Sequence, residues 1–193
     1  MLNLKMATDP RWVNLAEKNI SEILTDHAYC EQKAANSCIS LIIVYPDLKP
    51  IVEALTPIVA EEWSHFSMVL KEIYDRGLKL GYSRKDEYVN ALLKYQQKQG
   101  NREEVLVEKL LTNALIEARS CERFRLLSLE LKDDYLKKFY YSFMISEAGH
   151  YRLFMDLARI YKDKSYVDRR WQEYLNYELE IFKTIKIRGD RMH

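Results

Sequence analysis

Two short motifs of the same form limit what this 193-residue chain can fold into. The segments Glu62–His65 and Glu147–His150 each place a glutamate three residues before a histidine, inside a long and mostly apolar stretch. Residues three apart lie on neighbouring parts of one face of an α-helix, so each carboxylate and imidazole can point at the same place. A single pair of this kind can arise by chance and usually marks a polar helix surface, whereas two such pairs favour a shared functional site.

Each motif is preceded by a further glutamate at almost the same distance. Glu31 lies 31 residues before the glutamate of the first motif, and Glu117 lies 30 residues before that of the second. The strongest interruption of the helical pattern falls about midway in each interval, at 45–47 and at 131–134. If each half of the chain is an antiparallel helical hairpin, both glutamates of a half lie at the same height, roughly 22 Å from the turn.

Two hairpins of this kind, packed together, would bring four carboxylates and two imidazoles to one level of a bundle core. Ferritin-like di-iron and di-manganese proteins arrange their ligands in this way, with one glutamate from each of two helices and a Glu-x-x-His pair from each of the other two. The sequence therefore predicts an all-α, ferritin-like four-helix bundle, forming a single domain over 1–193, with a long crossover containing a short helix and an additional C-terminal helix. The predicted metal ligands are Glu31, Glu62, His65, Glu117, Glu147 and His150.

The ordinary interpretation of these side chains is that they are charges on helix surfaces. Against it, glutamates on inward faces beside alanines are poor core residues unless something compensates them, and together they would repel one another. Oxygen donors with two imidazoles suit two iron or manganese ions. In this hypothesis the two motif glutamates bridge the metals, Glu31 and Glu117 are terminal ligands, and each motif histidine binds one ion. His27, one turn before Glu31, is interpreted as a core or rim histidine bonded to a neighbour rather than a seventh ligand, and Glu61 as a solvated or supporting carboxylate.

Composition limits the class of protein. Nearly half of the residues are apolar and nearly a third are charged, with few glycines and prolines, which suits a helical domain and argues against disorder. A formal charge of +1 excludes a protein that binds nucleic acid through a surface that is basic all over, though not through a local basic patch. The three cysteines form no C-x-x-C pair and fit a reducing compartment. With neither a signal-peptide pattern nor an apolar run of membrane-spanning length, the chain is expected to be cytoplasmic.

Cap and break signals divide the chain into helices. Asp47 is expected to cap the second long helix, Gly77 to follow its end in the left-handed conformation, and Asn101–Glu104 to form a capping box. The tail Arg188–His193 is expected to fray, and its histidine is not expected to be a ligand. The predicted helices cover 12–44, which an interruption near 19–21 would divide, 48–76 with a kink at Pro57, 83–99, 101–131, 134–162 and 165–187, the last opened by a second capping box.

The ligand pattern also indicates a chemistry. A reduced di-iron site has open positions at which O₂ can bind and be activated, while the protein supplies ligands and a dry pocket. Electrons must come from outside, because the chain has neither a glycine motif for a flavin or nicotinamide nor a cysteine set for an iron–sulfur cluster. The predicted cofactors are two iron ions with O₂ as co-substrate and an external electron donor, which implies an electron-transfer protein or a reductase as a partner.

Four segments carry a more specific signal than the ligands alone. They are 116–124 (Ile-Glu-Ala-Arg-Ser-Cys-Glu-Arg-Phe), 61–66 (Glu-Glu-Trp-Ser-His-Phe), 75–77 (Asp-Arg-Gly) and 147–151 (Glu-Ala-Gly-His-Tyr). These segments resemble the MiaE-type tRNA hydroxylases, and the similarity extends from about Trp12 to the last helix with all six ligand positions matched. The resemblance implies O₂-dependent hydroxylation of the isopentenyl side chain of 2-methylthio-N6-isopentenyladenosine, beside the tRNA anticodon.

The residues that would bind the tRNA anticodon loop are less sharply defined. Basic side chains with interleaved tyrosines contact phosphates and stack splayed bases, and the target nucleotide must be turned outward to reach the metals. For any one cluster the alternative is a solvated surface balanced by nearby acids. The sequence leaves the oligomeric state open between monomer and dimer. The substrate-binding candidates are Arg76, Lys79, Arg84, Lys85, Arg169 and Arg170.

Two other functions are compatible with a ferritin-like site. The first is a di-iron or di-manganese peroxidase or oxidase acting on a small substrate, such as a rubrerythrin relative or a manganese catalase, although the cysteine-rich iron module of a full rubrerythrin is missing. The second is a non-enzymatic iron-handling protein that forms a cage. The crossover helix, the extra C-terminal helix and the charged outer faces do not favour a shell-forming surface.

Overall fold

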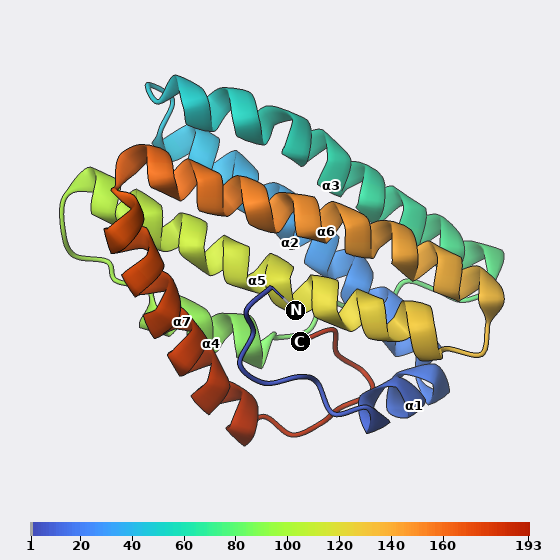
Figure 1. The fold of residues 1–193 in the computed structure, drawn as a ribbon. Helices are drawn as coiled ribbons and strands as arrows, with labels where there is room; N and C mark the ends of the chain where they lie inside the picture. Colours follow the sequence, from blue (N-terminus) through green and yellow to red (C-terminus); the bar gives the residue numbers. More distant parts are fainter. Residues whose placement is uncertain (1) are drawn as a thin grey trace. The chain divides into compact units, whose positions relative to one another are not determined.

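α-Helices account for all the regular secondary structure in residues 2–193, the part of the chain that the computed structural model describes (Figure 1). The prediction of an all-α protein is therefore confirmed. None of these helices is long and apolar enough to cross a membrane. In chain order they are α1 (Arg11–Lys18), α2 (Ile20–Val44), α3 (Lys49–Asp75), α4 (Glu87–Tyr95), α5 (Arg102–Glu130), α6 (Asp134–Tyr161) and α7 (Lys164–Thr184).

The chain divides into two compact units, each with its own helical hairpin. The α2–α3 unit consists of Asn14–Lys85 and Arg188–Met192. The α5–α6 unit consists of the N-terminal residues up to Val13, together with Asp86–Ile187 and His193. Because each unit has an interior of its own, the two are described separately, and the single domain over 1–193 stays a prediction.

Two long helices that pack along each other make up most of the α2–α3 unit (Figure 1). They are joined by residues 45–48 alone, where the backbone N–H of Leu48 donates to the carbonyl of Tyr45 at 3.1 Å. So short a connection makes α2 and α3 an antiparallel hairpin. The apolar side chains buried along them, some of them small on α2, include Leu24, Ala28, Ala35 and Leu41 from α2, and Ile51, Leu55, Val69 and Ile73 from α3.

Of the two predictions made for the ends of α3, the one for its N-cap is wrong and the one for its C-terminal glycine is confirmed. Leu48, not Asp47, is the N-cap residue, and no side chain caps the helix there. The N–H of Leu48 closes the turn from Tyr45, and the carbonyl of Leu48 accepts the first bonds of the helix from Ile51 and Val52, so Leu48 occupies the cap position. At the other end Gly77 has a φ of +69°, and the N–H of Leu78 donates to the carbonyl of Ile73 at 3.0 Å. A left-handed glycine with this bond is a common way to end a helix, so the prediction for Gly77 is confirmed.

The α5–α6 unit repeats the hairpin design. α5 and α6 pack along each other, and the side chain of Asp133 caps α6 by accepting from the N–H groups of Tyr135 and Leu136. Asn101 and Glu104 form the predicted capping box at the start of α5. α7 packs against α5, α6 and α4. The α5–α6 unit therefore contains four helices, whereas the α2–α3 unit consists mainly of its hairpin.

The starts of two helices in this unit differ from those predicted, and an aspartate explains each. α4 begins at Glu87 rather than near Ser83, because the carboxylate of Asp86 accepts from the N–H of Val89 at 2.9 Å. α7 begins at Lys164 rather than at a capping box opened by Ser165. Here Asp163 is the cap, and its side chain accepts the N–H three residues on. In both places the side chain of an aspartate caps the helix and sets its start.

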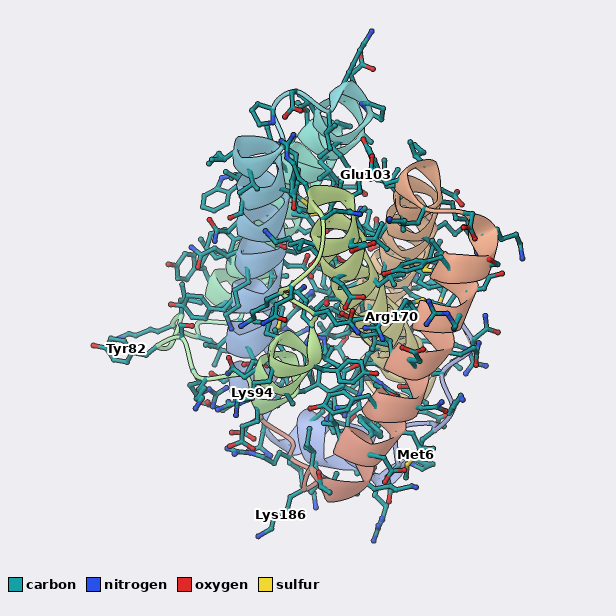
Figure 2. All side chains as sticks on the ribbon, turned by 90° about the vertical axis from the view of Figure 1, so that its left-hand side faces the viewer. Met6, Tyr82, Lys94, Glu103, Arg170 and Lys186 are labelled. Carbon is teal, nitrogen blue, oxygen red and sulfur yellow. The ribbon has the colours of Figure 1, made fainter. Side chains whose placement is uncertain are left out.

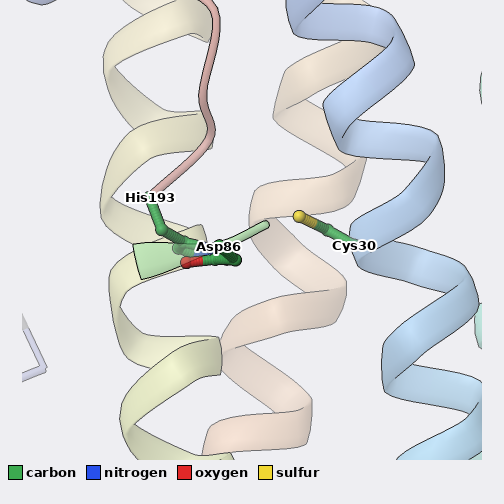
Figure 3. Close-up of side chains that lie close together, drawn as sticks. All are labelled: Cys30, Asp86 and His193. Atoms are coloured by element: carbon green, nitrogen blue, oxygen red, sulfur yellow. The ribbon is translucent and has the colours of Figure 1, made fainter. Parts of the chain in front are cut away.

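The tail Arg188–His193 is held in place, so the prediction that it frays is wrong. In the α2–α3 unit, the N–H of the buried Met192 donates to Asp26 Oδ2 at 2.8 Å. In the α5–α6 unit, His193 is buried with its Nδ1 3.1 Å from Asp86 Oδ2 and its Nε2 2.9 Å from Ser120 Oγ. Figure 3 shows His193 lying against Asp86. The tail is ordered because it supplies hydrogen-bond partners to buried polar groups.

A buried ion pair connects α5 to α7. The Arg119 side chain is fully buried, and its Nε donates to Glu178 Oε1 at 3.0 Å while its Nη1 donates to Glu122 Oε2 at 2.9 Å. Its guanidinium also lies over the ring of Phe182, 3.9 Å from the centroid. Glu122 accepts a further bond, at 2.8 Å, from the backbone N–H of Thr8. Glu122 is therefore a salt-bridge residue of the α5–α6 unit.

Replacing Glu178 by alanine is expected to lower the free energy of unfolding by about 3 kcal/mol, because Arg119 would keep its buried charge with one partner fewer. Urea unfolding of the metal-free protein, followed by circular dichroism, measures this change. Glu180→Ala is the matched control, since Glu180 is exposed and pairs with Lys183 on the surface of the same helix. A change of less than about 1 kcal/mol for Glu178→Ala would show that the buried pair is not important for stability.

Candidate metal centre

Three of the predicted ligands meet inside the α2–α3 unit. Glu31 comes from α2, and Glu62 and His65 come from α3. One donor atom of each lies within 4.8 Å of the others, and all three side chains are buried. His65 Nδ1 is 3.4 Å from Glu31 Oε2 and 3.4 Å from Glu62 Oε2. The hairpin brings them together because Glu31 and Glu62 stand at similar distances from the turn at 45–48.

Burial controls how tightly these groups hold protons. Loss of solvation raises the pKa of Glu31 to about 8, helped by the charge of Glu62 and opposed by hydrogen bonding to His65. Burial alone would lower the pKa of His65, but hydrogen bonds to Glu31 and Glu62, together with their charges, raise it to about 10. Without a cation, the group therefore retains protons at neutral pH. A metal ion would displace these protons and compensate the carboxylates in their place.

Two neighbouring side chains have supporting positions. His27 is fully buried, and its Nε2 is 2.7 Å from Glu31 Oε1, one turn along α2. The prediction of a core histidine bonded to a neighbour is confirmed. Glu61 is partly exposed, with its Oε1 3.8 Å from His65 Nε2. A histidine that fixes a carboxylate ligand from behind is a common supporting contact at metal sites.

The other three predicted ligands meet inside the α5–α6 unit. Glu117 comes from α5, and Glu147 and His150 come from α6, and one donor atom of each lies within 4.8 Å of the others. All three are buried. The thiol of Cys121, one turn after Glu117, donates to the backbone carbonyl of Met144 at 3.3 Å. Burial, followed by the charge of Glu117, raises the pKa of Cys121 to about 11, so this cysteine stays a neutral thiol.

Each unit thus holds the same donor set, two carboxylates and one imidazole, in a setting where protein side chains of this type are rare unless compensated. Carboxylate oxygen and imidazole nitrogen suit iron or manganese. The raised pKa of Glu31 gives an independent reason, because it shows how unfavourable an uncompensated carboxylate is in this interior. The residues present therefore fit the metal ions that the sequence predicts.

The predicted substrate contacts have different surroundings. Arg76 pairs with Glu72, and Arg84 pairs with Glu22 and Asp190. Lys79 and Lys85 are exposed, and neither takes part in an ion pair within residues 2–193.

On α7, Arg169 is exposed and pairs with Glu173 at 3.3 Å. Arg170, labelled in Figure 2, is buried instead. Its Nε and Nη2 donate to the two oxygens of Glu108 at 2.8 and 2.9 Å. The prediction that Arg170 contacts the substrate is therefore corrected, because its guanidinium is used inside the α5–α6 unit. Sequence reasoning also missed Glu108, although a glutamate in the mostly apolar run 105–111 was a usable signal of a buried ion pair.

The whole described chain matches one family model. The match covers residues 2–193, and the family is described as tRNA-(MS[2]IO[6]A)-hydroxylase (MiaE). The chain belongs to the MiaE family. This confirms the resemblance carried by the segments around the ligands.

Two relatives of this MiaE family member are named tRNA 2-(methylsulfanyl)-N(6)-isopentenyladenosine(37) hydroxylase. The one from Pseudomonas putida is 32% identical over 177 residues, which cover 92% of this chain and 85% of the relative. The one from Salmonella typhimurium is 26% identical over 205 aligned positions, which cover 81% of this chain and 75% of the relative.

A solved structure shares the fold. It is "Protein 43 with aldehyde deformylating oxygenase activity from Synechococcus", which is 31% identical and matches with a TM-score of 0.92 over 98% of this chain and 94% of that one. The ferritin-like fold predicted from the ligand spacing is confirmed by this match. A MiaE family member and an oxygenase named for an activity on aldehydes therefore have the same fold.

Glu147→Ala is expected to lower the iron bound per chain after anaerobic reconstitution with Fe(II), because it removes one of three buried donors in the α5–α6 unit. A colorimetric iron assay of the desalted protein measures the loss. Glu61→Ala removes a carboxylate that is partly exposed, and it should leave the iron content close to that of the unchanged protein. Full iron retention by Glu147→Ala would remove this residue from the ligand set.

His27→Gln is expected to keep the wild-type iron content, since glutamine can still donate a hydrogen bond to Glu31 from the position of the imidazole. The same iron assay applies, with thermal unfolding of the metal-free variant as a check on folding. Loss of half of the bound iron would instead identify His27 as a ligand.

Proposed function

We propose that this protein is an O₂-dependent di-iron monooxygenase that hydroxylates the isopentenyl side chain of 2-methylthio-N6-isopentenyladenosine next to the tRNA anticodon. The observation that carries the proposal is the match to the MiaE family over residues 2–193, with two relatives named for a hydroxylase of this nucleoside. Each unit also contains the buried carboxylates and imidazole that such an enzyme needs. A tRNA-modifying enzyme of this kind works in the cytoplasm.

The proposed iron ligands are the six predicted residues, three from each unit. The pairing of the two donor sets into one centre rests on the ligand pattern of ferritin-like di-iron proteins, in which two helices give one glutamate each and two give Glu-x-x-His. The donor chemistry of each set supports it. The ligands are Glu31, Glu62, His65, Glu117, Glu147 and His150.

When bound, two reduced iron ions allow O₂ to be reduced and a C–H bond to be oxidised, with one oxygen atom going to the product hydroxyl and the other leaving as water. The protein's side chains hold the donors in a dry interior and balance the positive charge with four carboxylates. His27 orients Glu31 through its hydrogen bond of 2.7 Å. The two electrons come from an external electron-transfer protein or reductase, since Cys30, Cys38 and Cys121 are the chain's three cysteines and are too few for a [4Fe–4S] cluster.

The substrate nucleotide has to leave its stack to meet buried donors. Single-stranded loop bases are turned outward at lower cost than bases in a duplex, and the anticodon loop offers such bases. The proposed partner is therefore tRNA presented through its anticodon loop.

A second function is favoured by one observation. The solved structure that shares this fold at 31% identity is named for an aldehyde deformylating oxygenase activity. Oxidation of a small substrate, rather than of tRNA, is therefore the alternative that the experiment must distinguish. An iron-storing cage has no comparable support.

The proposal is tested by mass spectrometry of nucleosides from tRNA of cells with and without this gene. Deletion is expected to abolish the hydroxylated isopentenyl nucleoside and to leave its unhydroxylated precursor in its place. Complementation with the unchanged gene should restore the product, and complementation with the Glu147→Ala gene should not.

Failure has a distinct form in this experiment. If the precursor is present and the hydroxylated nucleoside does not change on deletion, tRNA is not the substrate. Aldehyde turnover by the iron-loaded protein would then support the alternative, whereas a large hollow assembly on gel filtration would support iron storage.

A further inference from the structure

The loop between α3 and α4 presents one tyrosine almost entirely to solvent. Tyr82 is 94% exposed, and Figure 2 shows its side chain projecting outward from the loop. Aromatic side chains normally bury most of their large surface. Within residues 2–193, Tyr82 makes neither a ring contact nor a hydrogen bond. The position of this ring therefore has no explanation in the packing of the described chain.

The backbone that carries Tyr82 is fixed on its N-terminal side. The hydroxyl of Tyr29 donates to the carbonyl of Gly81 at 3.0 Å, and the N–H of Gly81 donates to Thr25 Oγ1 at 3.3 Å. A Cβ at position 81 would lie only 3.2 Å from Thr25 Cγ2, so glycine permits this close approach to α2. The residue before Tyr82 is thus tied to α2 at both its N–H and its C=O.

The loop is fixed on the C-terminal side as well. The guanidinium of Arg84 forms an ion pair with Glu22, and its Nη2 donates to the carbonyl of Glu22 at 3.1 Å and to the carbonyl of Asp190 at 2.8 Å. Both flanks of Tyr82 are therefore held by contacts within the α2–α3 unit. A ring presented from a fixed backbone loses less conformational entropy when a partner binds it.

Two exposed lysines near Tyr82 in the sequence have no acidic partner within the described chain. Lys79 and Lys85 are exposed and make no ion pair within the described chain, whereas the neighbouring Arg76 and Arg84 are paired with acids. The exposed residues within three positions of Tyr82 in the sequence are Gly81, Ser83 and the two lysines, and none of them is a large apolar residue. A protein interface has an apolar centre, whereas a nucleotide needs a flat ring for its base and cations for its phosphates.

We propose that Tyr82 is a stacking platform for an unpaired nucleotide of the tRNA substrate, and that Lys79 and Lys85 contact the phosphates beside that nucleotide. Stacking on a tyrosine ring suits single-stranded RNA loops, because every base has a flat face. This inference rests on the proposed function, since it assigns a binding surface to its substrate. It also separates two of the six predicted contacts from the four arginines, whose guanidinium groups already have partners.

The first test compares Tyr82→Ala and Tyr82→Phe in the full-length, iron-loaded protein. The probe is an anticodon stem-loop RNA that carries the isopentenyl nucleoside, and fluorescence anisotropy measures its dissociation constant. Tyr82→Ala is expected to weaken binding about fivefold or more, whereas Tyr82→Phe keeps the ring and should stay within about twofold. The control Tyr135→Ala removes another exposed tyrosine, which follows Asp133 and Asp134, and should not change the affinity.

The second test measures the role of the lysines from the salt dependence. For single-stranded nucleic acid, each phosphate contact contributes about 0.7 to the slope of log K against log salt concentration. The double variant Lys79→Gln with Lys85→Gln should therefore reduce the slope by about 1.4. Lys49→Gln with Lys164→Gln is the charge-matched control, because these lysines already pair with Glu53 and Asp168.

The outcomes separate this inference from the proposed function. If the unchanged protein hydroxylates the stem-loop but Tyr82→Ala binds it equally well at full iron content, the stacking role is overturned and the hydroxylase stands. If the unchanged protein binds the stem-loop through Tyr82 but does not hydroxylate it, the proposed reaction fails and the RNA contact stands. Unchanged RNA affinity with a loss of self-association in Tyr82→Ala would assign the ring to a contact between copies and overturn the inference.

Discussion

The burial of ionisable side chains on the facing sides of helices is the constraint on which this structure depends. In each unit two carboxylates and an imidazole occupy interior positions that an ordinary helical hairpin would fill with apolar residues. The α2–α3 hairpin accommodates them with small neighbours such as Ala28 and Ala35, and with His27, which is bonded to Glu31. This burial lowers the stability of the metal-free protein. The raised pKa of Glu31 shows that the interior destabilises the ionised carboxylate, which is the form that a metal ligand must adopt.

Buried charges outside the donor sets are compensated in a different way. Arg119 is bonded to Glu178 and Glu122, and Arg170 is bonded to both oxygens of Glu108, so these three buried carboxylates each meet a guanidinium. In the α2–α3 unit, Glu31 lies against the imidazoles of His27 and His65 instead. An arginine would neutralise a carboxylate permanently, whereas an imidazole can give up its proton and leave the site to a metal ion. Arg119 and Arg170 thus form permanent ion pairs in the scaffold, whereas the donors Glu31 and His65 hold exchangeable protons.

The features that could be read from the sequence are those set by periodicity. The spacing of Glu-x-x-His pairs gave the faces of α3 and α6, and the distance to Glu31 and Glu117 gave the hairpins, because helix geometry converts residue number directly into direction and height. Helix caps were less predictable, since Asp86 and Asp163 each competed with a plausible alternative nearby. The tail could not be predicted, because the partners of Met192 and His193 lie far away in the sequence, at Asp26, Asp86 and Ser120. Such contacts leave no periodic signal.

Fold and donor set do not by themselves select a substrate. The same backbone, matched with a TM-score of 0.92, occurs in a protein named for an aldehyde deformylating oxygenase activity. A function located in a site on a shared fold must be specified by residues outside the elements that the fold requires. The helices account for the fold and the six proposed donors would account for the metal, so selectivity for tRNA has to come from surfaces that neither requires. The loop that carries Tyr82 meets this condition, because its anchors at Gly81 and Arg84 hold a ring that contributes nothing to the interior.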